Sequence, residues 1–495
     1  MKIKNIYILA AVFAASLGLT SCEDYLDINQ DPNNPASSTP ALTLPAGQGE
    51  LAYVLGNQFQ FLGNYYAQHW TQAGAANQYC ELEQYQMTSS TYDTRVWAEF
   101  YAGALNDFKY VADQGNASGN ANYAAIGAIM QAYTFQVVTD AWGDVPFASA
   151  LGSLEVLNPE YQSQEDIYAG LITMLDGALA KIDEEGPAPG GDDLIFGGDM
   201  ALWRKFANTL KLKIYLRQVY IDEELNRNVA QAGIQAMYAA GAQFLETGET
   251  AAVPFADQTQ NRNPFYQTQV TFRGGVDVVA SNTALNLLQQ TDDPRIEHFY
   301  APAESGANAG NFVGIDQGVE CTPARAGEQA INYSKPGPAV ASATTAIPFI
   351  SAAESYFLQA EAVARGWGSG ATASALYELG IRASFDYLEV ADADAAATAL
   401  LQEPGVAYAG GTVEAQVEQI ITQKWLSFNG TQGFEAWTEY RRTGYPSFIE
   451  PSAASTLGAS LLPKRLIYPN SEATRNQNYP GLKEVSVPVW WDVKD

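Results

Sequence analysis

The chain has 495 residues, of which 47% are hydrophobic, 12% aromatic and 16% charged, so it is long and apolar enough to bury a sizeable core. Its 55 acidic residues outnumber the 26 basic ones, and the net charge of −29 would repel a phosphate backbone, which excludes nucleic acid as a partner. Only two histidines are present, His69 and His298, and this scarcity removes most metalloenzyme and histidine-base mechanisms.

The N-terminus has the pattern of an export signal. Lys2 and Lys4 precede an uncharged, mostly apolar stretch at residues 6–19, which is too short for a transmembrane helix. The tetrapeptide Leu19-Thr20-Ser21-Cys22 then resembles the lipobox of bacterial lipoproteins, in which cleavage precedes the cysteine and lipid is attached to it. We therefore expect a signal peptide at residues 1–21 and lipidation of Cys22, which would anchor the protein in a membrane. An ordinary secretory signal that ends in cysteine is the alternative.

Residues 22–45 are rich in Asp, Asn and Pro, a composition typical of a solvated acidic tether. Asp27, Asn29 and Asp31 have the spacing of a calcium loop, but Pro32 stands where such a loop needs glycine. We interpret the segment as a turn-rich, lipidated tether that holds the body of the protein, residues 46–495, off the bilayer.

Amphipathic helices dominate this body from about Leu51 onward. Apolar residues that recur every three or four positions predict them, as Leu202, Phe206 and Leu210 do. The helical pair 347–366 and 371–388 has about the size of one tetratricopeptide unit. The other predicted helices cover roughly 51–72, 93–113, 121–141, 163–183, 225–241, 281–290 and 413–429.

Long irregular stretches separate the helices. Residues 251–280 are polar and aromatic, and residues 303–346 are rich in Gly, Ala, Ser and Pro. Loops of this length on a packed helical body are usually functional or disordered, and the aromatic content of 251–280 favours an ordered functional role. Strand-like alternation is rare, with one short case at Val485, Val487 and Val489. The predicted fold class is mainly α: a tetratricopeptide-like helical-repeat scaffold with long irregular loops and a few short strands.

Catalytic motifs are largely missing from the sequence. Neither histidine lies in a His-Glu-x-x-His arrangement, no Cys or His cluster has metal-ligand spacing, and no Gly-x-Ser-x-Gly is present. Asp140 and Asp144 are four residues apart beside Gly143 and Pro146, so capping and turn roles come first. We expect a protein that is not an enzyme and has no metal or cofactor. A surface glycoside hydrolase that uses a carboxylate pair is kept as an alternative.

Two cysteines, Cys80 and Cys321, remain after lipidation of Cys22. An oxidising compartment would let them pair, but spacing alone does not tell whether they meet. Two buried free thiols agree with the sequence at least as well.

Aromatic residues beside polar or glycine-rich stretches are the best candidates for an exposed ligand-binding platform, because aromatic faces stack on sugar C–H surfaces. Trp142, Trp203, Trp425 and Trp437 sit in helical patterns and are interpreted as core. Nearby amide and guanidinium groups would supply hydrogen bonds to hydroxyl or carbonyl groups. The predicted ligand-binding residues are Trp70, Asn77, Tyr79, Phe265, Tyr266, Gln267, Phe272 and Arg273.

Several segments, taken together and in order, resemble the SusD/RagB family. No single motif is decisive, but the ordered set covers nearly the whole mature chain. The segments are 22–29 with 31–33, 142–147, 198–212, 293–295, 361–367, 423–425, 435–446 and 465–469.

This resemblance implies a surface lipoprotein of the outer membrane of Bacteroidota. Its tetratricopeptide-like scaffold would carry irregular loops that bind a nutrient, mostly a glycan and in some members a peptide. It also implies a SusC-like TonB-dependent transporter as partner, to which the ligand is handed without a bond being broken. The ligand residues of this family lie in variable loops, so only Cys22 carries over. A scaffold that recruits other surface proteins and binds no small ligand is a third hypothesis.

Overall fold

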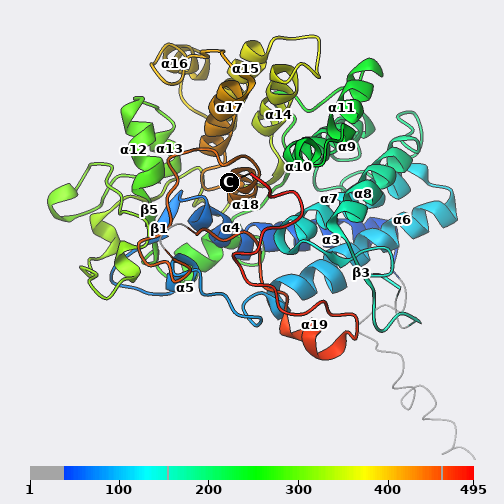
Figure 1. Cartoon of the computed structure of the whole chain (residues 1–495), viewed down its shortest axis with the longest axis horizontal. Coiled ribbons are helices and arrows are strands. Elements are labelled where there is room, and N and C mark those ends of the chain that lie inside the picture. The colour runs from blue at the N-terminus through cyan, green and yellow to red at the C-terminus, as the bar shows by residue number, and fades with distance from the viewer. Residues whose placement is uncertain (1–37, 153–154, 459–460, 495) are drawn as a thin grey trace, which may run out of the picture.

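The structure is a computed structural model that describes residues 38–152, 155–458 and 461–494 (Figure 1). The predicted signal peptide, Cys22 and most of the predicted tether lie outside the described residues. Helix α3 (Pro40–Leu55) begins inside the predicted tether 22–45. Proline suits the first turn of a helix, and Leu44 and Leu51 are already buried in the core. Residues 40–45 are therefore already part of a helix that packs on the body; the domain boundary at residue 46 stays a prediction.

The helix expected at 51–72 is wrong as a single element. It is split into the end of α3, helix α4 (Gln58–Tyr66) and strand β1 (Trp70–Gln72). The break falls at Gly56, where an added Cβ would lie 2.6 Å from a side-chain carbon of Ile347. Because Gly56 lets this distant segment approach the backbone so closely, tertiary packing overrides the helical pattern.

Consecutive helices pack side by side through the first half of the chain, α6 on α7, α7 on α8 and α8 on α9. Side-chain caps fix the N-termini of several helices. Asn120 accepts from the backbone N–H of Tyr123 at the start of α7, and Asp199 accepts from those of Ala201 and Leu202 at the start of α9. The elements are α5 (Cys80–Glu83), the π-helices η1 (Asp93–Trp97) and η2 (Glu99–Leu105), α6 (Asn106–Ser118), α7 (Ala121–Trp142), α8 (Gln164–Leu179), α9 (Met200–Arg217), α10 (Val219–Glu224) and α11 (Val229–Ala239).

The second half repeats this arrangement. Helices α14 and α15 form the predicted hairpin, except that residues 347–350 are a strand, and α17 packs on α14 while α18 packs on α4. The helices are α12 (Asn282–Gln290), α13 (Ile296–Phe299), α14 (Ala352–Ala364), α15 (Ala373–Tyr387), α16 (Ala393–Leu400), α17 (Val413–Ser427), α18 (Gly433–Thr443) and α19 (Asn470–Arg475). The mainly helical fold class is confirmed.

The strands of the described residues form short antiparallel two-stranded ribbons. They pair β1 with β5 (Val278–Ala280), β2 (Val145–Pro146) with β3 (Tyr161–Gln162), β4 (Ala251–Val253) with β8 (Ile347–Ile350), and β6 (Tyr300–Ala301) with β7 (Lys335–Pro336). The predicted strand at Val485, Val487 and Val489 is wrong: residues 485–489 are turn and irregular backbone. Pro488 cannot donate to a strand partner, and this favours the irregular form.

The helices form an arc, with α14, α15 and α17 at the top of Figure 1 and α6, α8, α9 and α11 at the right. The β1–β5 ribbon, α5 and α12 lie at the left, among long loops. Trp142, Trp203, Trp425 and Trp437 are fully buried, so their interpretation as core residues is confirmed. No helix of the described residues is long and apolar enough to cross a membrane.

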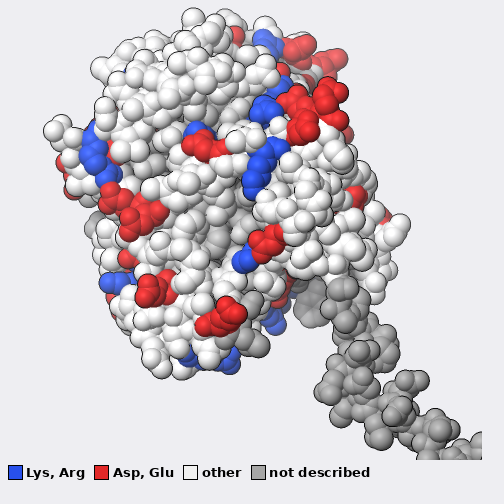
Figure 2. All heavy atoms as spheres, turned by 90° about the vertical axis from the view of Figure 1, so that its right-hand side faces the viewer, with Lys and Arg blue, Asp and Glu red and all other residues white. Residues whose placement is uncertain are grey.

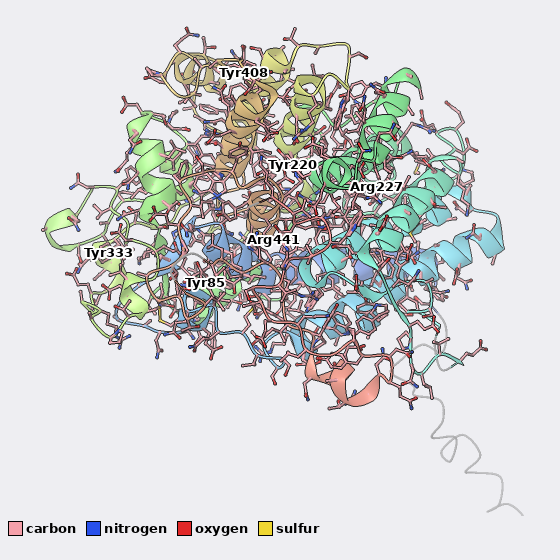
Figure 3. The ribbon with its side chains drawn as sticks, in the orientation of Figure 1. Tyr85, Tyr220, Arg227, Tyr333, Tyr408 and Arg441 are labelled. Atoms are coloured by element: carbon pink, nitrogen blue, oxygen red, sulfur yellow. A yellow bond between two sulfur atoms is a disulfide. The ribbon has the colours of Figure 1, made fainter. Side chains whose placement is uncertain are left out.

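Buried charges join the helices of the arc. Arg217 of α9 pairs with Glu435 at 2.5 Å and also with Glu439, both on α18. Arg442 of α18 pairs with Glu361 of α14 at 2.6 Å. Burial opposes the charged form of Glu439, but Arg442, Lys424 and Arg217 hold its pKa well below the usual range. We call this network, together with α9, α14 and α18, the helical frame. Arg441 of α18 is labelled near the middle of Figure 3.

Candidate functional site on the loop face

The β1–β5 ribbon supports the surface at the left of Figure 1. Trp70 pairs with Ala280 and Gln72 with Val278. The carboxamide of Gln72 donates to the carbonyl of Asp277 at 3.0 Å and accepts from the N–H of Tyr79 at 2.8 Å. We call the surface made by this ribbon, α5, α12 and the segments 73–79, 266–277, 313–335 and 446–453 the loop face.

A disulfide joins two segments of the loop face. Cys80 at the start of α5 bonds Cys321, with a Cα–Cα distance of 5.3 Å and a sequence separation of 241 residues. The pairing that the sequence left open is therefore formed. Nearby, Ala73, Val279, Ile315 and Ala330 make a small apolar cluster against which Tyr333 packs, and Figure 3 shows Tyr333 among the loops at the left.

Two predicted platform residues lie in the core. Trp70 is 0% exposed and Phe265 is 1% exposed, and their rings stack with centroids 4.8 Å apart. Both also lie against Phe61 of α4. The prediction that these two side chains are exposed is wrong, because the strand and the adjoining segment turn them onto the helical body. They support the loop face from below.

Tyr79 and Arg273 are brought together at the edge of the ribbon. The Tyr79 ring stacks on Phe61 with centroids 4.4 Å apart, and Arg273 forms an ion pair with the buried Asp277. Burial raises the pKa of Tyr79, the charge of Asp277 raises it further, and Arg273 opposes the rise. These groups form a half-buried aromatic and cationic edge that a ligand can reach.

The other predicted residues lie on the loops beside this edge. Phe272, the last residue of the π-helix η4 (Tyr266–Phe272), is 83% exposed. Tyr266 and Gln267 are half-buried at its start, and Asn77 is exposed on the segment 73–79. Phe272 is thus the most prominent aromatic group of the loop face. Contact between these residues and a ligand stays a prediction.

A cleft of about 570 Å³ lies on the loop face. It is rich in carboxamides, which both donate and accept hydrogen bonds. Its lining residues are Gln68, Asn282, Thr283, Asn286, Leu287, Gln290, Asp316, Gln317, Val319, Phe448, Glu450, Pro451 and Ala453. None of the predicted ligand-binding residues is among them.

Gln68 joins the two sides of the cleft. Its backbone is in the left-handed region, with φ of 59°, a strained conformation for a residue with a side chain. Its Oε1 accepts from the hydroxyl of Thr283 at 2.8 Å, and its Nε2 donates to the carbonyl of Glu450. The left-handed turn thus places a carboxamide between α12 and the segment 446–453.

One sequence signal could have located the cleft. Asn282, Asn286 and Gln290 recur every four residues, so they share one face of α12. The remaining lining residues come from segments far apart in the sequence, and no local pattern links them.

Glu83 anchors the walls of the cleft from beneath. The side chain is 1% exposed and accepts from the Thr71 hydroxyl at 2.7 Å, from Nε2 of Gln317 at 2.8 Å and from the Ser452 hydroxyl at 3.3 Å. Burial raises the pKa of Glu83 to about 7, although these hydrogen bonds favour the carboxylate. One carboxyl therefore holds β1 and both loop walls together.

The two loop walls also touch directly. Gly318 has φ of 78°, and an added Cβ would lie 1.9 Å from Oγ of Ser452. The hydroxyl of Tyr85 accepts from the N–H of Ser452 at 2.9 Å. In Figure 3, Tyr85 lies between Tyr333 and Arg441, toward the loops.

His69 and Asp140 are buried, and Asp140 and the exposed Asp144 accept structural hydrogen bonds. His69 is 0% exposed, and burial lowers its pKa to about 3, so the ring is neutral at physiological pH. Asp140 is also 0% exposed and accepts from Nε1 of Trp491 at 2.9 Å, while Asp144 accepts from the N–H of Gln164 at 2.8 Å. Among the described residues, no group of three or more His, Cys, Asp or Glu side chains is placed to hold a metal ion.

The opposite side of the molecule differs from the loop face. Figure 2 shows the side that carries α6, α8 and α11, where acidic and basic side chains lie in small mixed groups and most of the visible surface is uncharged. Ion pairs here include Lys211 of α9 with Asp176 of α8, and Arg204 of α9 with Glu184 in the turn that follows α8. No continuous basic patch is visible on the part of this side that the structure describes.

Comparison with known proteins places these features in a family. The SusD-like family, described as starch-binding and associating with the outer membrane, matches residues 32–469. A solved chitin-binding protein is 26% identical, with a TM-score of 0.75 over 91% of this chain and 100% of its own. A SusD homolog from Bacteroides fragilis is 25% identical, with a TM-score of 0.74 over 93% and 100% of the two chains.

A chitin-binding SusD homolog from Flavobacterium johnsoniae is 23% identical, with a TM-score of 0.74 over 92% of this chain and 98% of its own. At that identity the likeness concerns the fold. No curated protein gave a significant match.

Proposed function

This chain belongs to the SusD-like family, and from that premise we propose that it is a lipid-anchored protein of the cell surface that binds an oligomeric glycan on its loop face and delivers it to a SusC-like TonB-dependent transporter in the outer membrane. The observation that carries the proposal is the cleft of about 570 Å³ with five carboxamides in its lining. Carboxamides match the hydroxyl and acetamido groups of a sugar, which also donate and accept.

The exposed edge at the Gln72–Val278 end of the ribbon supports the same function. Phe272 and the half-buried Tyr79 offer aromatic faces, and Arg273 offers donors. Sugar rings can stack their C–H faces on these aromatic side chains. The chitin-binding relative makes oligomers of β-1,4-linked N-acetylglucosamine the first ligands to test.

The test is calorimetry of the purified protein with a panel of neutral oligosaccharides and with peptide mixtures, together with analysis of the products. We expect saturable binding to an oligosaccharide without hydrolysis. Release of shorter sugars would support the glycoside hydrolase instead. Binding to peptides alone would contradict the glycan assignment.

Two variants assign the binding to the loop face. Asn286→Ala with Gln290→Ala removes two exposed carboxamides that make no side-chain hydrogen bond to other described residues. We expect this double variant to bind oligosaccharide about tenfold more weakly. Gln231→Ala with Gln235→Ala removes two exposed carboxamides at the same spacing on α11 and is the matched control. Equal affinity of both double variants would contradict the site.

The edge is tested in the same way. Phe272→Ala should weaken oligosaccharide binding by about fivefold or more through lost stacking, while Leu157→Ala, which removes a side chain that is 73% exposed elsewhere on the molecule, should not weaken it.

Delivery is tested by co-purification: the transporter should co-purify with the protein from solubilised outer membrane. Other co-purifying surface proteins, with no oligosaccharide bound by the wild type, would support the scaffold hypothesis.

A further inference from the structure

The lining of the cleft is unbalanced in charge. Asp316 and Glu450 carry carboxylates, and the described residues that line the cleft include no lysine or arginine. Both carboxylates are exposed and come from opposite loop walls. Asp316 accepts from Nδ2 of Asn282 at 2.6 Å, whereas Glu450 is joined to Gln68 through its backbone carbonyl, which leaves its carboxylate out of that contact.

The basic side chains of the loop face do not line the cleft, so they do not pair there with the carboxylates of Asp316 and Glu450. Arg273 is paired with the buried Asp277, and Lys335 is paired with Glu304 at 2.6 Å. Arg325 is exposed on the segment 313–335 and does not line the cleft. The whole chain has a net charge of −29, so the protein as a whole adds negative charge to that of the two carboxylates.

The floor of the cleft offers an acceptor. Gln317 is 9% exposed, and its Nε2 donates to the carbonyls of Tyr65 and Trp70 and to Glu83. Its Oε1 is buried and has no hydrogen-bond partner among the described residues. The side of the cleft formed by Gln317 therefore has an unsatisfied acceptor and no unsatisfied donor from this residue.

The rim adds an apolar face. Phe448 is 43% exposed and its ring lies edge-on to the buried Trp425, with centroids 5.6 Å apart. A sugar ring can lay its C–H face on Phe448 while its substituents reach the carboxamides and carboxylates. The cleft thus combines an apolar rim, donor–acceptor walls and two negative charges.

We propose that the cleft selects amino sugars that carry a free amine, accepts their N-acetylated or hydroxyl counterparts more weakly, and rejects sugars that carry a carboxylate. The inference rests on the proposed function and names the substrate class of the same site. A protonated amine is donor-only and positive, so it matches the carboxylates that Asp316 and Glu450 place on opposite walls of the cleft. A ligand carboxylate would be repelled by both.

The experiment compares β-1,4-linked glucan pentamers that differ in one substituent. Three of them carry a free amine, an acetamide or a hydroxyl at C2, and a fourth carries a hydroxyl at C2 and a carboxylate at C6. Calorimetry is run with the purified full chain at mildly acidic pH, where the amine is protonated. We expect the amine-bearing pentamer to bind about threefold to tenfold tighter than the acetamide and the carboxylated one to bind least.

One double variant, one control variant and the salt dependence locate the selectivity. Asp316→Asn with Glu450→Gln should remove the preference for the amine, so that the amine-bearing and hydroxyl-bearing pentamers bind this variant with affinities within about twofold of each other. Glu224→Gln removes one exposed carboxylate of α10, outside the cleft, and should leave the preference unchanged. In the wild type the preference should also shrink when salt rises from about 0.05 M to about 0.5 M, because salt screens exposed charges.

Equal affinities for the amine, the acetamide and the carboxylate, or a preference that survives in the Asp316 and Glu450 variant, would overturn the charge selectivity while the proposed glycan binding stands. Binding of none of the pentamers and of no other oligosaccharide would overturn the proposed function itself. The two failures therefore give different results.

Discussion

The helical frame and the loop face are held together in different ways. In the frame, buried ion pairs such as Arg217 with Glu435 and Arg442 with Glu361 link helices α9, α14 and α18. On the loop face, the strands of the ribbon are three residues long, and one disulfide and one buried carboxyl, Glu83, join the segments.

This difference separates stability from recognition. The frame depends on many mutually satisfied buried charges, so removing one leaves others without partners. The loop face depends on few contacts, and its side chains Phe272, Asn286 and Gln290 stay exposed for a ligand. We expect changes in the frame to alter global unfolding and changes in the loop face to alter binding first.

The largest effect is expected from breaking the frame. Arg217→Met leaves Glu435, Glu439 and Asp140 buried beside an uncharged side chain, and should lower the free energy of unfolding by about 3–5 kcal/mol. Denaturant unfolding measures this. The control Lys109→Met breaks an exposed pair with Asp113 and should cost less than about 1 kcal/mol. Similar losses in both variants would contradict a frame built on buried charge.

The next effect concerns the disulfide. Cys80→Ser with Cys321→Ser removes a cross-link over 241 residues and should lower the free energy of unfolding by about 2–4 kcal/mol. Limited proteolysis should then cut within 73–79 or 313–335 before it cuts the frame helices. Unchanged stability and an unchanged order of cleavage would show that the loop face does not depend on this bond.

A smaller effect is expected from Glu83, with a defined dependence on pH. Burial raises its pKa from 4.5 to about 7, so between these values the unfolded chain releases the proton while the folded protein keeps it. Stability is therefore lost as pH rises from about 4.5 to about 7, by on the order of 2 kcal/mol, and this part of the slope should vanish in Glu83→Gln.

Glu81→Gln, on the exposed side of α5, is the matched control for Glu83 and should keep the wild-type slope. Unfolding free energies measured at several pH values give the comparison. If Glu83→Gln has the same slope as the wild type, Glu83 does not hold a proton in the folded protein.

The smallest effect lies in the helical region, and its dependence on pH has the same sign as that of Glu83. Burial, together with the hydrogen bond and charge of Glu99 on η2, raises the pKa of Glu50 on α3 from 4.5 to about 8. Stability is lost as pH rises through that range, so Glu50→Gln should be more stable than the wild type at pH 8 by about 1 kcal/mol, after allowance for solvent screening. A thermal melt at pH 8 that shows Glu50→Gln less stable than the wild type would contradict this.

The sequence predicted much of the frame and less of the loop face. The apolar spacing of Leu202, Phe206 and Leu210 and the cap at Asp199 depend on local contacts, and α9 is formed where they indicate. At Gly56 the prediction was wrong, because the close approach of Ile347 is not visible in the local pattern.

For the site, composition indicated aromatic residues but not which way they face. Phe272 is exposed, as expected for a platform, whereas Trp70 and Phe265 are buried. The cleft itself was missed, because Gln68, Gln317 and Glu450 lie on segments that only folding brings together. The carboxamides at every fourth position of α12 were the one feature of the local sequence that indicated the cleft.

By itself the sequence determined the helical class, the positions of most helices and the family resemblance, because these rest on local periodicity, caps and ordered motifs. The tertiary structure decided that Cys80 meets Cys321, that Glu83 is buried among four hydrogen-bond donors, and that carboxamides from distant segments line one cleft. The reason is physical: burial and close approach of segments far apart in the chain set these distances and pKa values, and neither is encoded in any short stretch of residues.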